Sequence, residues 1–143
     1  ALCSMNASFT AEIVPAFYQF YMKYMGVDRF DDIWSGIFLK KVADHLEDRI
    51  CLGAPLIFHN KRPRNVFKDL KSELHGMEIH ERLWRLIDDM PLDGKAYWDV
   101  YSSLIERLKS NVAKWFDDAV HLKFLKTQIE KMQMWCEITD KLK

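Results

Sequence analysis

Two adjacent acids and a histidine are the residues whose types and spacing could do chemistry. Asp31 and Asp32 stand at the expected start of a helix, and His59 ends a later apolar segment and is followed by the cation Lys61. A carboxylate accepts hydrogen bonds from hydroxyl groups and takes up a proton once its pKa is tuned. Lysine and arginine side chains neutralise anionic groups. This combination indicates a corner of the molecule that binds an anionic ligand.

One helix and one strand must position these side chains. Asp31 or Asp32 is expected to cap the helix, because a carboxylate there accepts free backbone N–H groups and suits the positive helix end. Apolar residues at three- and four-residue spacing give this helix one buried face; they are Ile33, Trp34, Ile37, Phe38, Val42 and Leu46. Residues 50–58 are expected to form a buried strand, broken by Gly53 and Pro55, that delivers His59 to its end.

The rest of the chain indicates a mainly helical α/β fold with about two short strands and five or so helices. We expect the other strand over residues 2–9, a helix from Thr10 to about Tyr24, and a helix capped by Asn65 that Gly76 can interrupt. Residues 95–143 contain no proline or glycine and predict two or three long amphipathic helices. We therefore predict a single domain or domain fragment, with residues 1–60 mixed α/β and residues 61–143 helical.

Composition and charge exclude several classes of protein. The chain has 143 residues, of which 49% are hydrophobic, and its 21 basic and 21 acidic residues cancel. No overall field therefore favours nucleic acid or an anionic membrane. No apolar run approaches the roughly 20 residues that span a bilayer, and no signal peptide is visible, so we expect a cytoplasmic protein or one on the cytosolic face of a compartment.

The cysteines and the first residues add two expectations. Cys3, Cys51 and Cys136 are widely spaced and odd in number, which argues against a zinc site or a disulfide framework and fits a reducing compartment. The sequence starts at Ala1 without an initiator methionine, so we expect a fragment, an isolated domain or a processed product.

Five segments resemble, in order and at similar spacing, the reversibly glycosylated polypeptides, the UDP-arabinopyranose mutase family. The segment Arg-Phe-Asp-Asp-Ile-Trp-Ser-Gly at residues 29–36 resembles the family's Arg-Tyr-Asp-Asp-Met-Trp-Ala-Gly. Residues 41–46 resemble its Val-Ile-Cys-Asp-His-Leu, and residues 53–61 its Gly-Leu-Pro-Tyr-Ile-Trp-His-Ser-Lys. Residues 65–71 and 5–9 resemble Asn-Pro-Phe-Val-Asn-Leu-Lys and Met-Asn-Leu-Ala-Phe. The resemblance covers roughly residues 3–76.

The resemblance implies a glycosyltransferase-like fold of the GT-A type that acts on a UDP-sugar with a divalent metal, Mn²⁺ or Mg²⁺. In that family the nucleotide-binding half and its Asp-x-Asp motif lie upstream of the part that matches. This chain contains no Asp-x-Asp. We therefore expect the C-terminal part of a UDP-sugar mutase or glycosyltransferase, inactive on its own.

The resemblance also implies roles for six residues. Asp31 and Asp32 would be catalytic, holding sugar hydroxyls or acting as a base. His59 would be a late metal ligand, since imidazole suits Mn²⁺. Arg29, Trp34 and Lys61 would bind the substrate, with the indole stacked on a sugar or uracil ring and the lysine neutralising the diphosphate.

Each of these roles has a structural alternative. The two acids could only cap a helix, His59 could be a structural histidine, and Trp34 could belong to the core. For Arg62 and Arg64 a solvated loop is the better interpretation. We interpret His75, His80 and His121 as structural because they show no ligand spacing, and the pairs at 88–89 and 117–118 as exposed helix charges.

A second hypothesis belongs to a different class of function. The supply of Trp, Tyr, Phe and Met would suit a non-catalytic helical module whose surface forms a homo- or hetero-oligomer, because these residues are enriched at interfaces. A thermal shift with UDP and Mn²⁺ separates the two hypotheses, because only a ligand-binding protein is stabilised by them.

Overall fold

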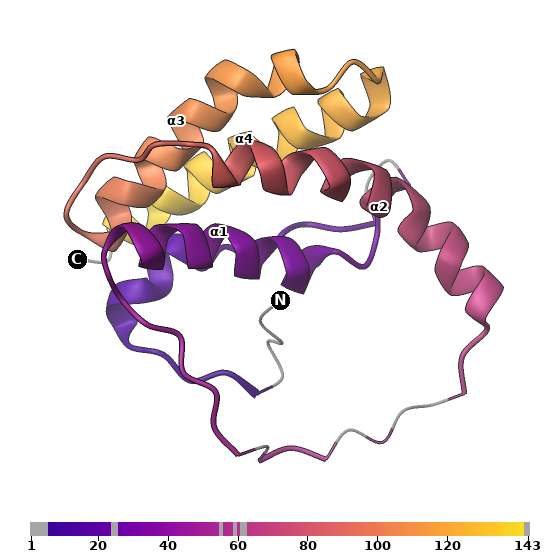
Figure 1. Ribbon diagram of the computed structural model, residues 1–143, viewed down its shortest axis with the longest axis horizontal. Coiled ribbons are helices and arrows are strands. Elements are labelled where there is room, and N and C mark those ends of the chain that lie inside the picture. The colour runs from indigo at the N-terminus through magenta and orange to yellow at the C-terminus, as the bar shows by residue number, and fades with distance from the viewer. Residues whose placement is uncertain (1–5, 24–25, 55, 59, 61–62, 142–143) are drawn as a thin grey trace.

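The structure, a computed structural model, is built from helices. It describes residues 6–23, 26–54, 56–58, 60 and 63–141. One 3₁₀ helix, η2 (Ala11–Ala16), is followed by four α-helices, α1 (Asp31–His45), α2 (Val66–Asp88), α3 (Tyr97–Trp115) and α4 (Ala119–Asp140). Figure 1 shows α3 and α4 side by side as a pair, with α1 and η2 lying along one side of the pair and α2 running across the molecule.

The prediction of two short strands is wrong, because the described residues contain no strand. The segment expected to be a buried strand, residues 50–58, is irregular where it is described, and its side chains face solvent: Leu52 is 95% exposed and Phe58 is 91% exposed. A strand needs neighbours to pair with its backbone and cover its side chains. This segment lacks them in the described structure, so its apolar residues alone do not make it a strand. Of the other predicted strand, residues 2–5 lie outside the described residues, and residues 6–9 are not extended into a sheet.

The helix expected from Thr10 is short and of the 3₁₀ type. It ends at Ala16 and contains Pro15, which has no N–H to continue a helical hydrogen-bond pattern. The chain then runs without regular structure through residue 23. Phe20 is still buried, and its ring packs on Trp34 and Phe38 of α1.

The long helices follow the apolar periodicity of the sequence. The apolar face of α3 is buried in full, and it comprises Tyr97, Tyr101, Leu104, Ile105 and Leu108. The chain leaves the helix at Phe116 and enters α4 after Asp118, whose side chain accepts a hydrogen bond from the backbone N–H of His121 (2.8 Å). The acids at 117–118 therefore form the break between two helices, and Asp118 is a cap rather than a mid-helix charge.

Helix α2 is continuous, and Gly76 does not interrupt it. Asn65 caps it as predicted, because its side chain accepts a hydrogen bond from the N–H of Lys68 (3.1 Å). In the described part of the chain, no helix is both long and apolar enough to cross a membrane. The core formed by these helices contains Trp34 of α1, Tyr101 of α3 and Phe124 of α4, all almost fully buried.

Candidate functional site

The corner at the start of α1 is held to α2 by Arg29. This residue adopts a left-handed backbone conformation (φ 67°) and points its guanidinium at α2. Its Nη1 lies 2.9 Å from an Asp69 carboxylate oxygen, and its Nε lies 2.6 Å from a Glu73 oxygen. Ionic hydrogen bonds of this kind are stronger than neutral ones. Arg29 therefore ties the entry of α1 to the first turns of α2.

Asp31 and Asp32 form the first turn of α1, one position later than a cap. The cap position is taken by Phe30, and no side chain accepts a hydrogen bond there, so the prediction that one of the acids caps the helix is wrong. Asp31 is exposed and Asp32 is half-buried. Neither carboxylate makes an ion pair or side-chain hydrogen bond with another described residue. Their negative charge suits the positive end of the helix.

Trp34 lies inside the core rather than at the surface of this corner. Its side chain is fully buried, and its ring packs on Phe20, Phe30 and Phe124 at centroid distances of 5.9, 5.2 and 5.9 Å. The indole Nε1 has no hydrogen-bond partner in the described part of the chain. Such packing is typical of a structural tryptophan, and a stacking role would require the core to open.

His59 and Lys61 lie outside the described residues, so the predicted meeting of an imidazole with the two acids stays a prediction. Their described neighbour Phe58 is exposed. Arg64 is exposed as well, in agreement with the interpretation as a solvated loop, whereas Arg62 is also outside the described residues.

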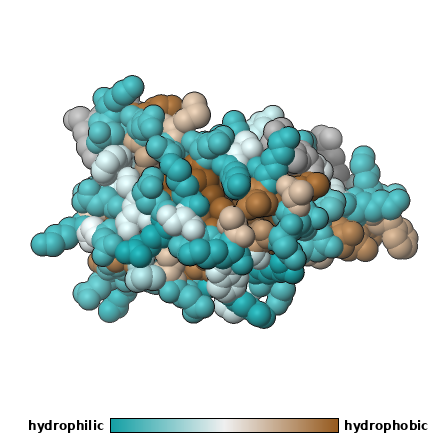
Figure 2. Space-filling view, turned by 90° about the horizontal axis from the view of Figure 1, so that it is seen from above, coloured by the Kyte–Doolittle hydropathy of each residue, from teal (hydrophilic) through white to brown (hydrophobic). Residues whose placement is uncertain are grey.

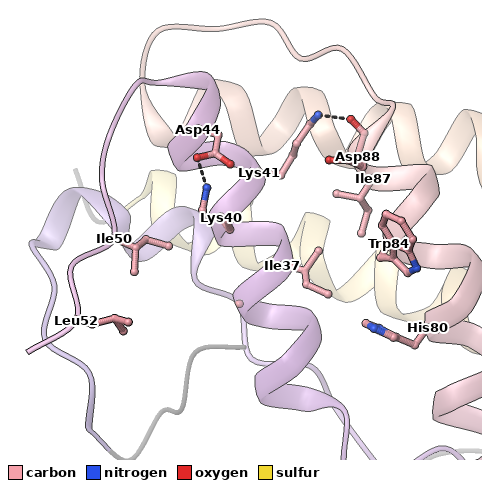
Figure 3. A pocket seen from close by; sticks show the side chains of 11 residues that line it. Ile37, Lys40, Lys41, Asp44, Ile50, Leu52, His80, Trp84, Ile87 and Asp88 are labelled. Atoms are coloured by element: carbon pink, nitrogen blue, oxygen red, sulfur yellow. Dashed lines mark hydrogen bonds and ion pairs between the residues drawn. The ribbon is translucent and has the colours of Figure 1, made fainter. Parts of the chain in front are cut away.

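A groove between α1 and α2 is a candidate binding site that the sequence reasoning missed. Its volume is about 650 Å³, and Figure 3 shows its lining from α1, from α2 and from the segment after α1. Ile37, Ile87 and Trp84 give it apolar walls, and Lys40 and Lys41 stand at its rim. Lys40 pairs with Asp44, and the Lys41 ammonium donates a hydrogen bond to the backbone oxygen of Asp88 (2.7 Å). An apolar groove with a few fixed polar groups can hold a small organic ligand.

The imidazole of His80 is part of the lining of the groove. Its Nδ1 is buried and has no hydrogen-bond partner among the described residues, and the centroid of its ring lies 5.7 Å from that of the Phe30 ring. Burial lowers the pKa of His80, so the neutral imidazole is favoured. The sequence signal for this site was the pair His80 and Trp84, four residues apart on one helix face. Asp31 and Asp32 lie at the other end of α1 and do not line the groove.

Comparison with known proteins identifies the family. The model of the family described as "Reversibly glycosylated polypeptide" matches residues 1–143. UDP-arabinopyranose mutase 1 of Oryza sativa subsp. japonica is 28% identical over 96% of this chain and 38% of its own length. UDP-arabinopyranose mutase 1 of Arabidopsis thaliana is 29% identical over 99% of this chain and 39% of its own length. The probable UDP-arabinopyranose mutase 4 of Arabidopsis thaliana is 32% identical over 75% of this chain and 31% of its own length.

The chain belongs to the reversibly glycosylated polypeptide family. The resemblance found in the sequence motifs is therefore confirmed, and it extends over the helical tail as well. The chain spans well under half the length of these relatives.

Proposed function

We propose that this chain forms the sugar-facing part of a UDP-sugar site in a mutase or glycosyltransferase-like protein. The names of its relatives support a UDP-arabinopyranose-type substrate. The observation that carries the proposal is the state of Asp31 and Asp32, two carboxylates that have no partner among the described residues and lie at a helix start that Arg29 fixes in place. Carboxylates held this way accept hydrogen bonds from vicinal sugar hydroxyls.

The chemistry assigned to the corner is assistance at the anomeric carbon. In a UDP-sugar the anomeric C–O bond to the diphosphate breaks, and the sugar hydroxyls must be held while it does. One acid holds a sugar hydroxyl. The other accepts the proton of the hydroxyl that attacks the anomeric carbon, while the bond from that carbon to the diphosphate breaks and UDP leaves. Arg29 keeps N–H donors beyond the two used by α2, and with Lys61 it would face the diphosphate.

A divalent cation, Mn²⁺ or Mg²⁺, belongs to this proposal for the complete site, where it would neutralise charge on the leaving diphosphate. Mg²⁺ requires oxygen ligands in octahedral geometry. In the described part of the chain, the one group of three metal-type side chains is His75, Glu78 and His121, which is not an oxygen set. In this proposal His59 would be a ligand for Mn²⁺, which accepts imidazole, and the remaining ligands would come from outside this chain.

Thermal unfolding of the 143-residue chain with UDP-arabinopyranose tests the proposal. A ligand at one hundred times its dissociation constant stabilises a protein by about 2.7 kcal/mol, so the unfolding temperature should rise by several degrees. Asp31→Asn and Asp32→Asn should each reduce the shift. Glu106→Gln, on exposed α3 surface, is the matched control and should leave it unchanged. The proposal would be overturned if the wild-type chain showed no shift in unfolding temperature up to millimolar ligand. It would also be overturned if both aspartate variants showed the same shift as the wild type.

A second candidate function, an interaction module, is favoured by the apolar side chains on either side of the start of α2. Leu52, Leu56, Phe58, Val66 and Phe67 are all strongly exposed. Figure 2 shows apolar surface at the end of the molecule where α2 begins in Figure 1. Exposed apolar residues in such numbers are typical of protein interfaces.

Light scattering of the wild-type chain and of a Phe58→Ser, Phe67→Ser variant tests this second function. If the module self-associates, the wild-type mass should exceed 17.0 kDa and the double variant should return to it. A wild-type mass of one chain at high concentration would rule out self-association.

A further inference from the structure

We infer that His75, Glu78 and His121 form a zinc site that joins α2 to α4. None of these three residues is among those assigned to the sugar-facing corner. His75 and Glu78 are three residues apart on α2 and therefore share one helix face. His121 lies in the first turn of α4, directly after the break between α3 and α4. Three donor atoms from two helices meet at this point.

The distances between the donors fit the edges of a zinc tetrahedron. His75 Nδ1 and His121 Nε2 lie 3.1 Å apart, and the Glu78 Oε2 lies 3.3 Å from the first and 3.4 Å from the second. In a tetrahedral site with zinc–nitrogen bonds of about 2.0–2.1 Å, neighbouring donors are about 3.3–3.4 Å apart. The three atoms are therefore spaced as three corners of one coordination sphere.

Hydrogen bonding alone does not satisfy these three atoms equally. A neutral imidazole carries a proton on only one nitrogen, and an ionised carboxylate only accepts. If one of the two nitrogens, His75 Nδ1 or His121 Nε2, carries a proton and donates it to the other, neither nitrogen has a further proton to donate to the Glu78 carboxylate. A cation at the centre accepts all three lone pairs at once, with the ring protons on the outer nitrogens.

The surroundings orient His121 and favour a cation. Asp118 accepts the backbone N–H of His121, and its carboxylate lies 3.8 Å from the outer ring nitrogen Nδ1. Metal-bound histidines commonly direct their outer N–H at such a carboxylate. The adjoining hollow of about 390 Å³ is lined by Glu81 and Asp117 as well, and its cation Arg82 is already paired with Asp117 at 2.7 Å.

The donor set selects zinc over Mg²⁺ or Ca²⁺. Two imidazoles and one carboxylate are a common three-residue set for zinc, whose fourth position is then filled by water or a ligand. His121 is nearly buried, whereas the side chains of His75 and Glu78 are about half exposed. Solvent can therefore reach the fourth position.

The consequence for the fold is a direct link between two helices that otherwise pack mainly on other partners. Helix α2 lies chiefly against α1 and α3, whereas α4 packs on α3 and η2. Zinc would connect the middle of α2 to the start of α4. Binding should therefore raise the unfolding temperature, because the folded state alone brings the donors together.

Titration calorimetry of the metal-free chain with zinc chloride tests the site. We expect one zinc per chain with a dissociation constant in the micromolar range or tighter, a rise in unfolding temperature, and no comparable response to Mg²⁺. His75→Ala and Glu78→Gln should weaken binding at least tenfold. His45→Gln and Cys51→Ser, which alter a histidine and an exposed thiol elsewhere, should bind as wild type does.

A spectroscopic readout keeps the test decisive if a variant is poorly folded. Cobalt in place of zinc should give the absorption of a tetrahedral site in the wild type and lose it in His121→Gln, with helix content checked by circular dichroism. Zinc binding that survives in His75→Ala and Glu78→Gln, or a wild-type chain that binds no zinc at millimolar concentration, would overturn the inference.

Discussion

Gly76 of α2 lies directly against the ring of Phe30, the residue that precedes the two acids of α1. A Cβ built on Gly76 would lie 2.6 Å from the Phe30 Cε2 and closer still to its Cδ2. The Phe30 ring also packs on Trp34 at 5.2 Å. The absence of a side chain at Gly76 therefore allows the start of α1 to pack closely against the middle of α2.

Gly76→Ala should destabilise the protein despite the better helix propensity of alanine. The propensity gain is about 1 kcal/mol, whereas forcing an extra carbon into a packed contact costs roughly 1–3 kcal/mol. We expect a net loss of about 1 kcal/mol in the free energy of unfolding, measured by urea denaturation. Gly53→Ala is the control, because no atom of the described residues lies within 4 Å of its Cβ position. An unchanged midpoint for Gly76→Ala would contradict the close contact.

Arg29→Gln should loosen the link between α1 and α2. The change removes two ionic contacts whose side chains are 32%, 26% and 28% exposed, so each contact is only partly screened by water. We expect a loss of roughly 1 kcal/mol in unfolding free energy. A double-mutant cycle with Asp69→Asn measures the coupling energy between Arg29 and Asp69. A value near zero would contradict the prediction that this contact stabilises the protein. Lys40→Gln, which breaks an exposed pair four residues apart on α1, should cost less than about 0.5 kcal/mol.

Removal of the hydroxyl group should lower the free energy of unfolding at one buried tyrosine of α3 and should not lower it at the other. The Tyr97 hydroxyl donates a hydrogen bond to Asp48 (2.8 Å), whereas the Tyr101 hydroxyl is buried and has no partner among the residues that the structure describes. Tyr97→Phe should cost about 1 kcal/mol, and Tyr101→Phe should be neutral or stabilise by about 1 kcal/mol. Urea unfolding of both variants checks the pair, and a larger loss for Tyr101→Phe would contradict it.

The protein should also lose stability in strong base when the Tyr97 hydroxyl ionises. Burial, together with the hydrogen bond to Asp48, raises the pKa of Tyr97 to about 12 from its ordinary 10.0. A raised pKa in the folded state gives stability that is full below pH 10 and is lost as the pH rises through about 12. The difference in unfolding free energy between wild type and Tyr97→Phe should shrink over this range.

The Asp118 carboxylate should make the stability of the protein fall in acid rather than in base. The hydrogen bond from the His121 backbone N–H lowers the pKa of Asp118 below its ordinary 3.8. A lowered pKa gives stability that is present above the unfolded value and is lost as the pH falls through the folded one. Asp118→Asn keeps a capping side chain but no charge, so its stability in metal-free buffer should depend less on pH below about 4. Identical acid profiles for the two proteins would contradict this.

The family and the long helices could both be predicted from the amino-acid sequence alone. The motifs around Asp31 and Asp32 identified the family, and the apolar spacing in residues 97–108 placed the buried face of α3, because a helix face is a local property of the chain. Capping of α2 by Asn65 was equally local.

The contacts between helix faces, and the residues that these contacts bring together, could be seen only in the folded molecule. The meeting of His75 and Glu78 with His121, of Arg29 with Asp69, and of Phe30 with Gly76 joins residues 40 or more positions apart. No local pattern encodes such contacts. Strand formation is non-local in the same way: residues 50–58 have strand-like composition, but a strand exists only where a second one pairs with it, and the described structure provides none.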